Sequence, residues 1–238
     1  YVFADNISVF IKQDLELNSA TSNFYLCNDL QLLQGTTVAG ANRWVGNLSI
    51  YQEGTVNNYQ YNYWCSPVGN TLSATAINNP FGINQLRDVI TLTVSNNHII
   101  LPMNNYDGSA SPLSIAPYWI WKFISSSTYP QWIQVGSSNT INAGEGFTMK
   151  GTIGSNQRYD FRGKPNDGNI ATAVSLNNFT LIGNPYPSAI DLNLFLLDPI
   201  NTPFITGTAY FWEQMVTNSH YISQYQGGYG TYTPASGY

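Results

Sequence analysis

The sequence contains little charge. Only 9% of its 238 residues are Asp, Glu, Lys or Arg, and the formal net charge is −5. Binding to a nucleic-acid backbone requires a concentrated basic face, because neutralising phosphates supplies most of the affinity. The eight Lys and Arg residues are instead scattered along the chain. We therefore expect no nucleic-acid partner.

Long apolar runs are also missing. A helix that spans a bilayer needs about 20 consecutive, mostly apolar residues, and no segment of the sequence approaches that length. No membrane insertion is therefore expected. The chain opens on a strand-like segment, residues 1–11, where a secretory leader would be basic and then apolar. We interpret this start as a processed or excised edge.

Cysteines are scarce, and Cys27 and Cys65 are the only two. The even count allows one disulfide in an oxidising compartment, and two buried thiols are the other interpretation. Neither cysteine has the Cys-x-x-Cys spacing or the neighbouring histidines of a metal or redox site. The sequence leaves the pairing open and predicts no cysteine chemistry.

Groups suited to catalysis are few. His98 and His220 lie in polar surroundings without a Ser or Cys nucleophile motif beside them, and no Gly-x-Ser-x-Gly elbow occurs. Glu145, between two glycines, and Glu213, after an aromatic run, are explained about equally well as functional or as surface carboxylates. We therefore predict that the protein is not an enzyme.

Calcium is the only cofactor that the sequence suggests. The clusters at residues 104–108 and 165–168 bring several side-chain oxygens together around Asp-Gly pairs. They lack the full spaced ligand set of a calcium loop. The same residue types favour tight turns, because they tolerate positive φ. We expect turns at both places, and no cofactor.

Strand and turn chemistry is abundant. Short runs rich in β-branched and aromatic residues alternate with clusters of Asn, Gly, Pro and Ser, which is typical of many short strands. One short helix is expected over residues 189–197, where apolar residues recur at helical spacing before Pro199. The clearest expected strands cover residues 46–51, 59–64, 89–94, 118–123, 146–150, 159–162 and 179–182.

These patterns predict an all-β protein with two related antiparallel lobes, each resembling a β-sandwich or jelly roll, and with little helix. We place the first lobe, which includes an N-terminal strand region, at residues 1–155. The second lobe is placed at residues 156–238.

An internal repeat relates the two expected lobes. Residues 61–67 and 179–185 both run from an apolar strand into a turn with Pro, and an aromatic run follows each. The first copy then continues into Ala-Gly-Glu-Gly-Phe at residues 143–147, which the second copy lacks. Folded proteins pair or cover strand edges. We hypothesise that the second lobe is incomplete and that a strand from beyond Tyr238, or from a neighbouring chain, completes it.

Aromatic residues give two candidate binding features. Trp119, Trp121 and Trp132 could form a stacking platform for sugar rings, although large aromatic side chains also fill cores. The C-terminal tyrosines alternate with Gly and Gln and make adaptable contact surfaces at low ordering cost. This expected interaction segment comprises Tyr221, Tyr225, Tyr229, Tyr232 and Tyr238.

Several runs resemble a known group of proteins. They cover residues 61–69, 143–151, 159–168, 181–188 and 207–212. These runs are similar to those of large secreted proteins of Flavobacterium-type Bacteroidetes. The resemblance implies export by the type IX secretion system to the cell surface or the medium. Most members of this group are uncharacterised and adhesin-like, so the resemblance implies an extracellular location rather than a reaction.

The sequence therefore predicts an extracellular structural or adhesive surface protein, such as an assembling filament or matrix subunit that is completed by strand addition. Its partners would be other copies of itself or neighbouring surface proteins. The alternative is a carbohydrate-binding module of a secreted protein, for which the partners would be glycans.

Overall fold

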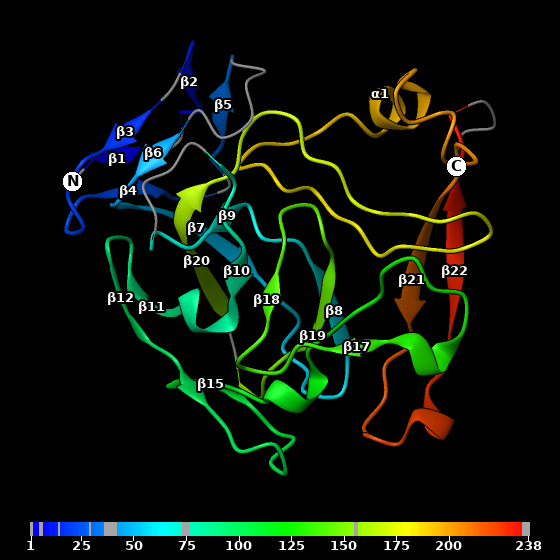
Figure 1. Cartoon of the computed structure of the whole chain (residues 1–238). Helices are drawn as coiled ribbons and strands as arrows, with labels where there is room; N and C mark the ends of the chain where they lie inside the picture. The colour runs from blue at the N-terminus through cyan, green and yellow to red at the C-terminus, as the bar shows by residue number, and fades with distance from the viewer. Residues whose placement is uncertain are drawn as a thin grey trace.

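The computed structural model describes residues 2–4, 7–13, 15–28, 30–35, 42–72, 77–154 and 157–234 (Figure 1). Within these ranges the protein is all-β, with α1 (Leu192–Leu197) as the only α-helix. The expected fold class is confirmed at this level. Short 3-10 turns lie at Ile83–Gln85, Pro117–Trp119, Tyr129–Gln131 and Ile222–Gln224.

The N-terminal strands form a coil of parallel strands. β1, β2 and β3 stack in parallel on β4, β5 and β6, and β4 stacks on β7. Parallel neighbours need a long crossover, and here the other strands of the same turn provide it, as in a β-solenoid. The bounds of these strands are Val2–Ala4, Val9–Ile11, Glu16–Leu17, Asn23–Leu26, Leu32–Gln34, Arg43–Trp44 and Asn47–Glu53.

The parallel coil corrects the expectation of purely antiparallel sheets. Strands of two to four residues are too short to display the alternation that reveals a strand's partner. The coil is nevertheless well packed, because the side chains of Phe24, Leu26, Leu32, Trp44 and Leu48 are all buried.

The main sheet joins this coil to strands from much later in the chain. Its order is β1-β4-β7-β20-β11-β12, with β20 (Arg158–Pro165) antiparallel to both β7 and β11 (Leu86–Thr91). β12 (Val94–Asn97) follows β11 after a turn at Leu92, so the single strand expected over 89–94 is wrong. β9 (Val68–Gly69) pairs with the end of β20.

The position of β20 corrects the expected lobe boundary after residue 155. β20 is a central strand of the N-terminal sheet rather than the first strand of a second lobe. Tyr159 and Phe161 on β20 are fully buried, because they complete the core beneath the earlier strands. The described residues between 2 and 165 therefore form one unit, which we call the body.

A second sheet packs against the main sheet to close the body. Its order is β17-β16-β19-β8, all antiparallel. The ring centroids of Trp64 on β8 and Phe161 on β20 are 5.6 Å apart, so the two sheets meet face to face. Phe81 stacks between Phe161 and Phe147, with centroids 5.6 and 6.0 Å away. These strands are Ile133–Gln134, Trp121–Lys122, Phe147–Lys150 and Tyr61–Trp64.

Two small sheets complete the body. β10 pairs with β18, and β15 pairs with β13 and β14. The two segments of the expected repeat, residues 61–67 and 179–185, differ in structure. Residues 61–64 form β8, whereas Phe179 and Ile182 make only isolated bridges. The remaining strands of the body are Phe81–Gly82, Thr140–Ile141, Ile99–Ile100, Ser109–Ala110 and Leu113–Ile115.

The C-terminal part, residues 166–234, crosses the body as a long segment and then forms α1 and a hairpin of β21 (Ala209–Gln214) and β22 (Gly227–Tyr232). The expected helix is confirmed, and Asp191 caps its N-terminus by accepting from the Leu194 N–H. Figure 1 shows α1 and the hairpin on the side of the molecule opposite the N-terminal coil.

Candidate functional site

Exposed apolar side chains gather on α1, the turns after it and the β21–β22 hairpin. Their exposed fractions run from 44% for Phe211 to 83% for Val216. Beyond Phe161, Leu196 is the only aliphatic or aromatic side chain other than proline that is buried in the part of the chain that the structure describes. We call this set the C-terminal surface: Leu194, Leu197, Ile200, Phe204, Tyr210, Phe211, Met215, Val216, Tyr221, Ile222 and Tyr229.

The C-terminal surface is almost uncharged. Between residues 169 and 234 the sequence has three acidic residues, Asp191, Asp198 and Glu213, and no Lys or Arg. Contiguous exposed apolar area on a protein commonly marks an interaction site. A surface with so little charge also offers little electrostatic repulsion to a second surface of the same kind.

The hairpin has a defined backbone orientation. In an antiparallel ladder, residues whose backbone groups face the partner alternate with residues whose groups face outward. The Met215 N–H donates to the Gln226 carbonyl at 2.8 Å, so this pair faces inward. The Gln214 carbonyl faces outward, as the alternation requires, and accepts from Gln60 Nε2 at 3.4 Å. The outer side of β21 therefore abuts the body at this end.

Within the described residues, the outer edge of β22 is open at Gly227, Tyr229 and Thr231. The register places the backbone groups of Gly227, Tyr229 and Thr231 on this edge, facing away from β21. Among the residues that the structure places, β22 pairs with β21 alone. An unpaired edge presents a row of donors and acceptors that another strand can take up.

The expected tyrosine segment is split by the structure. Tyr221 and Tyr229 are 74% and 68% exposed and belong to the C-terminal surface. Tyr225 is half-buried against the body, and the Tyr232 hydroxyl donates to Asn193 Oδ1 on α1. Tyr238 lies outside the described residues.

A buried lysine links the hairpin to the body. Lys150, the last residue of β19, is only 4% exposed. Its Nζ lies 2.9 Å from His220 Nδ1, donates to the Tyr225 hydroxyl and sits 3.4 Å from the centroid of the Trp119 ring. His220 Nε2 in turn lies 2.8 Å from Asp107 Oδ1. We call these five residues the Lys150 cluster.

The surroundings of Lys150 in the cluster shift its pKa strongly. Burial lowers the pKa of Lys150 to about 7, although the nearby Asp107 acts to raise it. His220 stacks on Trp119 with ring centroids 5.1 Å apart. Sequence reasoning missed this cluster, because Lys150 and His220 are 70 positions apart and His220 and Asp107 are 113 apart. Nothing in the local spacing connects them.

The cluster also corrects the expected sugar platform. Trp119 is 5% exposed and lies under Lys150, so its ring is not available for stacking on a glycan. Trp121 and Trp132 are half-buried, and the Trp132 ring lies 5.0 Å from that of Phe123. The three tryptophans therefore do not form one exposed platform.

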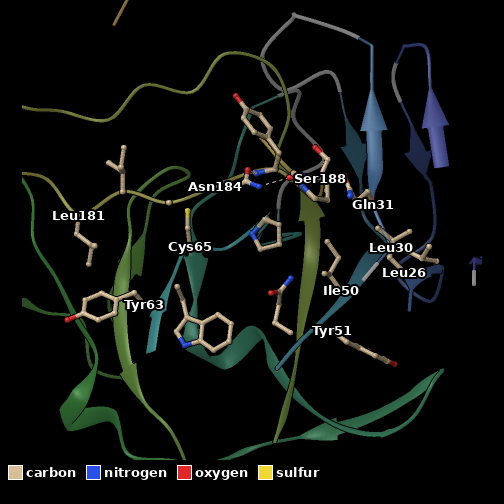
Figure 2. Close-up of a pocket in the computed structure, with 18 residues that line it drawn as sticks. Leu26, Leu30, Gln31, Ile50, Tyr51, Tyr63, Cys65, Leu181, Asn184 and Ser188 are labelled. Atoms are coloured by element: carbon tan, nitrogen blue, oxygen red, sulfur yellow. Dashed lines mark hydrogen bonds between the residues drawn. The ribbon is translucent and has the colours of Figure 1, made fainter. Parts of the chain in front are cut away.

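A cleft of about 430 Å³ opens between the two sheets (Figure 2). Figure 2 shows Tyr63 and Cys65 on one wall and Ile50 and Tyr51 on the other, with Leu181 above Tyr63. Among the residues that the structure describes, no charged side chain lines the cleft. Its other lining residues are Leu26, Leu30, Gln31, Gln52, Trp64, Pro67, Ile182, Gly183, Asn184, Tyr186, Pro187, Ser188 and Ala189.

Several polar groups of the cleft are already engaged within the protein. The Tyr51 hydroxyl donates to the backbone carbonyls of Thr91 and Leu92, and Gln31 Oε1 accepts from the Ala189 N–H at 3.0 Å. Ligand sites orient their ligand through a few convergent polar groups. With these groups occupied, the cleft is a weaker candidate than the C-terminal surface.

Glu145 serves the structure. It accepts from Lys122 Nζ at 2.8 Å and from the Asn142 N–H and Nδ2 at 2.9 and 3.0 Å. Burial acts to raise its pKa, but the hydrogen bonds from Lys122 and Asn142 outweigh burial and hold the pKa below its usual value. Glu213 is exposed on β21.

The two Asp-Gly clusters have protein partners. Asp107 accepts from His220, and Asp167 Oδ2 accepts from the Asn42 N–H at 3.0 Å. Over the described ranges, no group of three or more His, Cys, Asp or Glu side chains is placed to hold a metal ion.

Cys27 and Cys65 are thiols in the structure, so the disulfide interpretation does not hold here. Cys27 follows β4 in the main sheet, and its Sγ donates to the Leu92 carbonyl at 3.3 Å. Cys65 follows β8 in the second sheet, and burial raises its pKa to about 12. The two residues thus follow strands of opposite sheets.

Thiol titration checks this correction. We expect two thiols per chain to react with a disulfide reagent in denaturant without reductant. In the native protein at pH 8, Cys65 should react roughly tenfold or more slowly than an exposed thiol, because little of it is thiolate. Fewer than two reactive thiols in the denatured, unreduced protein would contradict the structure.

Together these features define an all-β protein with an open strand edge and an uncharged apolar surface at its C-terminal side. The chain belongs to a family described as a domain of unknown function (DUF8693), whose model matches residues 101–237, more than half of the chain. All members of the Lys150 cluster and the C-terminal surface lie in this range. Searches of curated proteins and of solved structures gave no match. In the described part, no helix is long and apolar enough to cross a membrane.

Proposed function

We propose that the protein is an extracellular structural or adhesive surface protein that assembles with further copies of itself by strand addition at the outer edge of β22. The observation that supports this most directly is the open edge at Gly227, Tyr229 and Thr231, beside exposed apolar side chains. Strand addition gains affinity from main-chain hydrogen bonds, and side chains on either face give specificity.

A second copy suits this edge better than a charged partner would. The C-terminal surface has no basic side chain and few acidic ones, so two copies can approach without strong repulsion. β22 also contains three glycines, and a Cβ added at Gly228 would meet no atom within 4 Å. The face of the strand is therefore open at this position.

The extracellular location rests on sequence. The five runs that resemble exported Flavobacterium-type Bacteroidetes proteins include residues 207–212, which contain most of β21. Strands rich in uncharged polar and aromatic residues suit a surface protein whose copies are held together by hydrogen bonds and apolar contacts rather than by ion pairs. Secretion of the protein and labelling of intact cells would test this part.

A proline at position 231 tests the strand edge. The Thr231 N–H faces outward, so Thr231→Pro should remove a donor from the outer edge while it leaves the β21–β22 ladder intact. We expect the mass of the wild-type protein, followed by sedimentation velocity and light scattering, to rise with protein concentration. The Thr231→Pro variant should remain monomeric at the same concentrations.

Thr231→Ala is the matched control. It keeps the backbone donor and should assemble like the wild-type protein. A wild-type protein that stays monomeric at all concentrations, or a Thr231→Pro variant that assembles normally, would refute strand addition at β22. A glycan array on the same samples checks the alternative: sugar binding by a monomer, lost in Trp132→Ala, would replace assembly with glycan recognition.

A further inference from the structure

The loop between β21 and β22 contacts the body at one buried ionisable side chain, that of Lys150. His220 and Tyr225 both belong to this loop, and both contact Lys150 Nζ. The His220 ring is also enclosed by aromatic rings of the body, with centroids 4.7 Å away at Tyr59, 5.1 Å at Trp119 and 6.0 Å at Tyr106. The loop therefore forms the lid over a lysine that would otherwise meet solvent.

The groups around Lys150 make one connected chain. Lys150 Nζ donates to the Tyr225 hydroxyl and lies 2.9 Å from His220 Nδ1, the Tyr225 hydroxyl donates to the His220 carbonyl at 3.4 Å, and His220 Nε2 lies 2.8 Å from Asp107 Oδ1. A neutral amine keeps the two N–H groups that these contacts use. The other titratable group that faces Lys150 is Tyr61 on β8, whose ring centroid is 5.2 Å from Nζ. Burial raises the pKa of Tyr61, and raises that of Tyr225 to about 12.

We propose that the Lys150 cluster is a proton-controlled latch, which holds the β21–β22 hairpin on the body while Lys150 is neutral and loosens it when Lys150 is protonated. Closing the loop over a charged ammonium removes the charge from water, and only Asp107 lies nearby to compensate. Attraction between the ammonium and the Trp119 ring offsets part of this cost.

The sign of the pH effect follows from the two states. With the loop open, Lys150 is exposed and titrates near 10.5, whereas with the loop closed its pKa is about 7. Between these values the open state binds more protons, so closure strengthens as pH rises from 7 towards 10 and is weakest, and constant, below 7. Tyr61 and Tyr225 keep their protons across this window, because their pKa values are raised.

Hydrogen exchange on dilute, monomeric protein tests the latch. After correction for intrinsic exchange, we expect the amides of β21 and β22 to gain protection of roughly fiftyfold between pH 7 and pH 9. At both pH values they should remain less protected than the amides of β20, because the hairpin opens without unfolding the body. Lys150→Met, which keeps an apolar stem under the loop, should abolish the pH dependence.

Lys12→Met is the control, since Lys12 is exposed in the N-terminal coil; it should keep the wild-type pH dependence. The latch would be overturned by hairpin protection that is flat between pH 7 and 9 or equal to that of β20. Retention of the full pH dependence in Lys150→Met would also overturn it. If Lys150→Met does not fold, the wild-type series alone decides. The measurement uses monomers, so its outcome is separate from whether β22 recruits a partner.

Discussion

Replacing Phe161 with alanine should lower the free energy of unfolding by about 3–5 kcal/mol, the usual cost of truncating a buried Phe. Phe161 is fully buried on β20, the strand that joins the N-terminal coil to β11. Its ring lies 5.6 Å from the ring centroids of both Phe81 and Trp64, so the variant leaves a cavity between the two sheets. Denaturant unfolding followed by Trp fluorescence measures the loss.

Phe204→Ala is the matched comparison on the C-terminal surface. Phe204 is 73% exposed, so in a dilute monomer its removal should change the free energy of unfolding by no more than about 0.5 kcal/mol. Its effect should appear instead as weaker assembly at high concentration. If Phe204→Ala destabilised the monomer as much as Phe161→Ala, the C-terminal surface would be covered within the chain, and it would lose its role as an interface.

Much of the body could be predicted from local sequence. Runs such as 61–64, 147–150 and 159–162 form strands, because β-branched and aromatic residues suit a pleated, half-buried surface. The helix was also predictable, since its apolar spacing is a local signal, although it begins at Leu192, after the Asp191 cap, rather than at residue 189. Tyr159 and Phe161 alternate along β20, which predicts one buried and one exposed face, but Asp160 between them is also fully buried, so the strand has no exposed face there.

The partners of these strands could not be predicted in the same way. Pairing between β4 and β7, or between β20 and β11, depends on residues far apart in sequence, for which a single sequence holds no periodic signal. The predicted boundary between two lobes after residue 155 was therefore wrong. A sequence pattern can identify a strand without identifying the strands with which it pairs. Buried polar groups posed the same problem, and the Lys150 cluster joins four segments that no motif connects.

Some of the tightest constraints in the body are backbone contacts at glycine, and Gly69→Ala should expose one of them. A Cβ at Gly69 would lie 1.9 Å from the Asn79 carbonyl oxygen, a contact that the backbone must move to relieve. Movement is opposed on one side by the pairing of β9 with β20. On the other side, the Asn70 N–H donates to the Pro80 carbonyl at 3.0 Å. We expect a loss of about 2–3 kcal/mol in the free energy of unfolding, at the upper end of overpacking costs.

Gly228→Ala separates this clash from the general effect of removing a glycine. A Cβ at Gly228 meets no atom within 4 Å, so the variant should unfold with unchanged or slightly higher free energy, because alanine restricts the unfolded chain. Both variants are measured by denaturant unfolding under the conditions used for Phe161→Ala. Equal losses at the two positions would show that the contact between a Cβ at position 69 and Asn79 does not set the cost, and would contradict the close packing of β9 against residues 79–80.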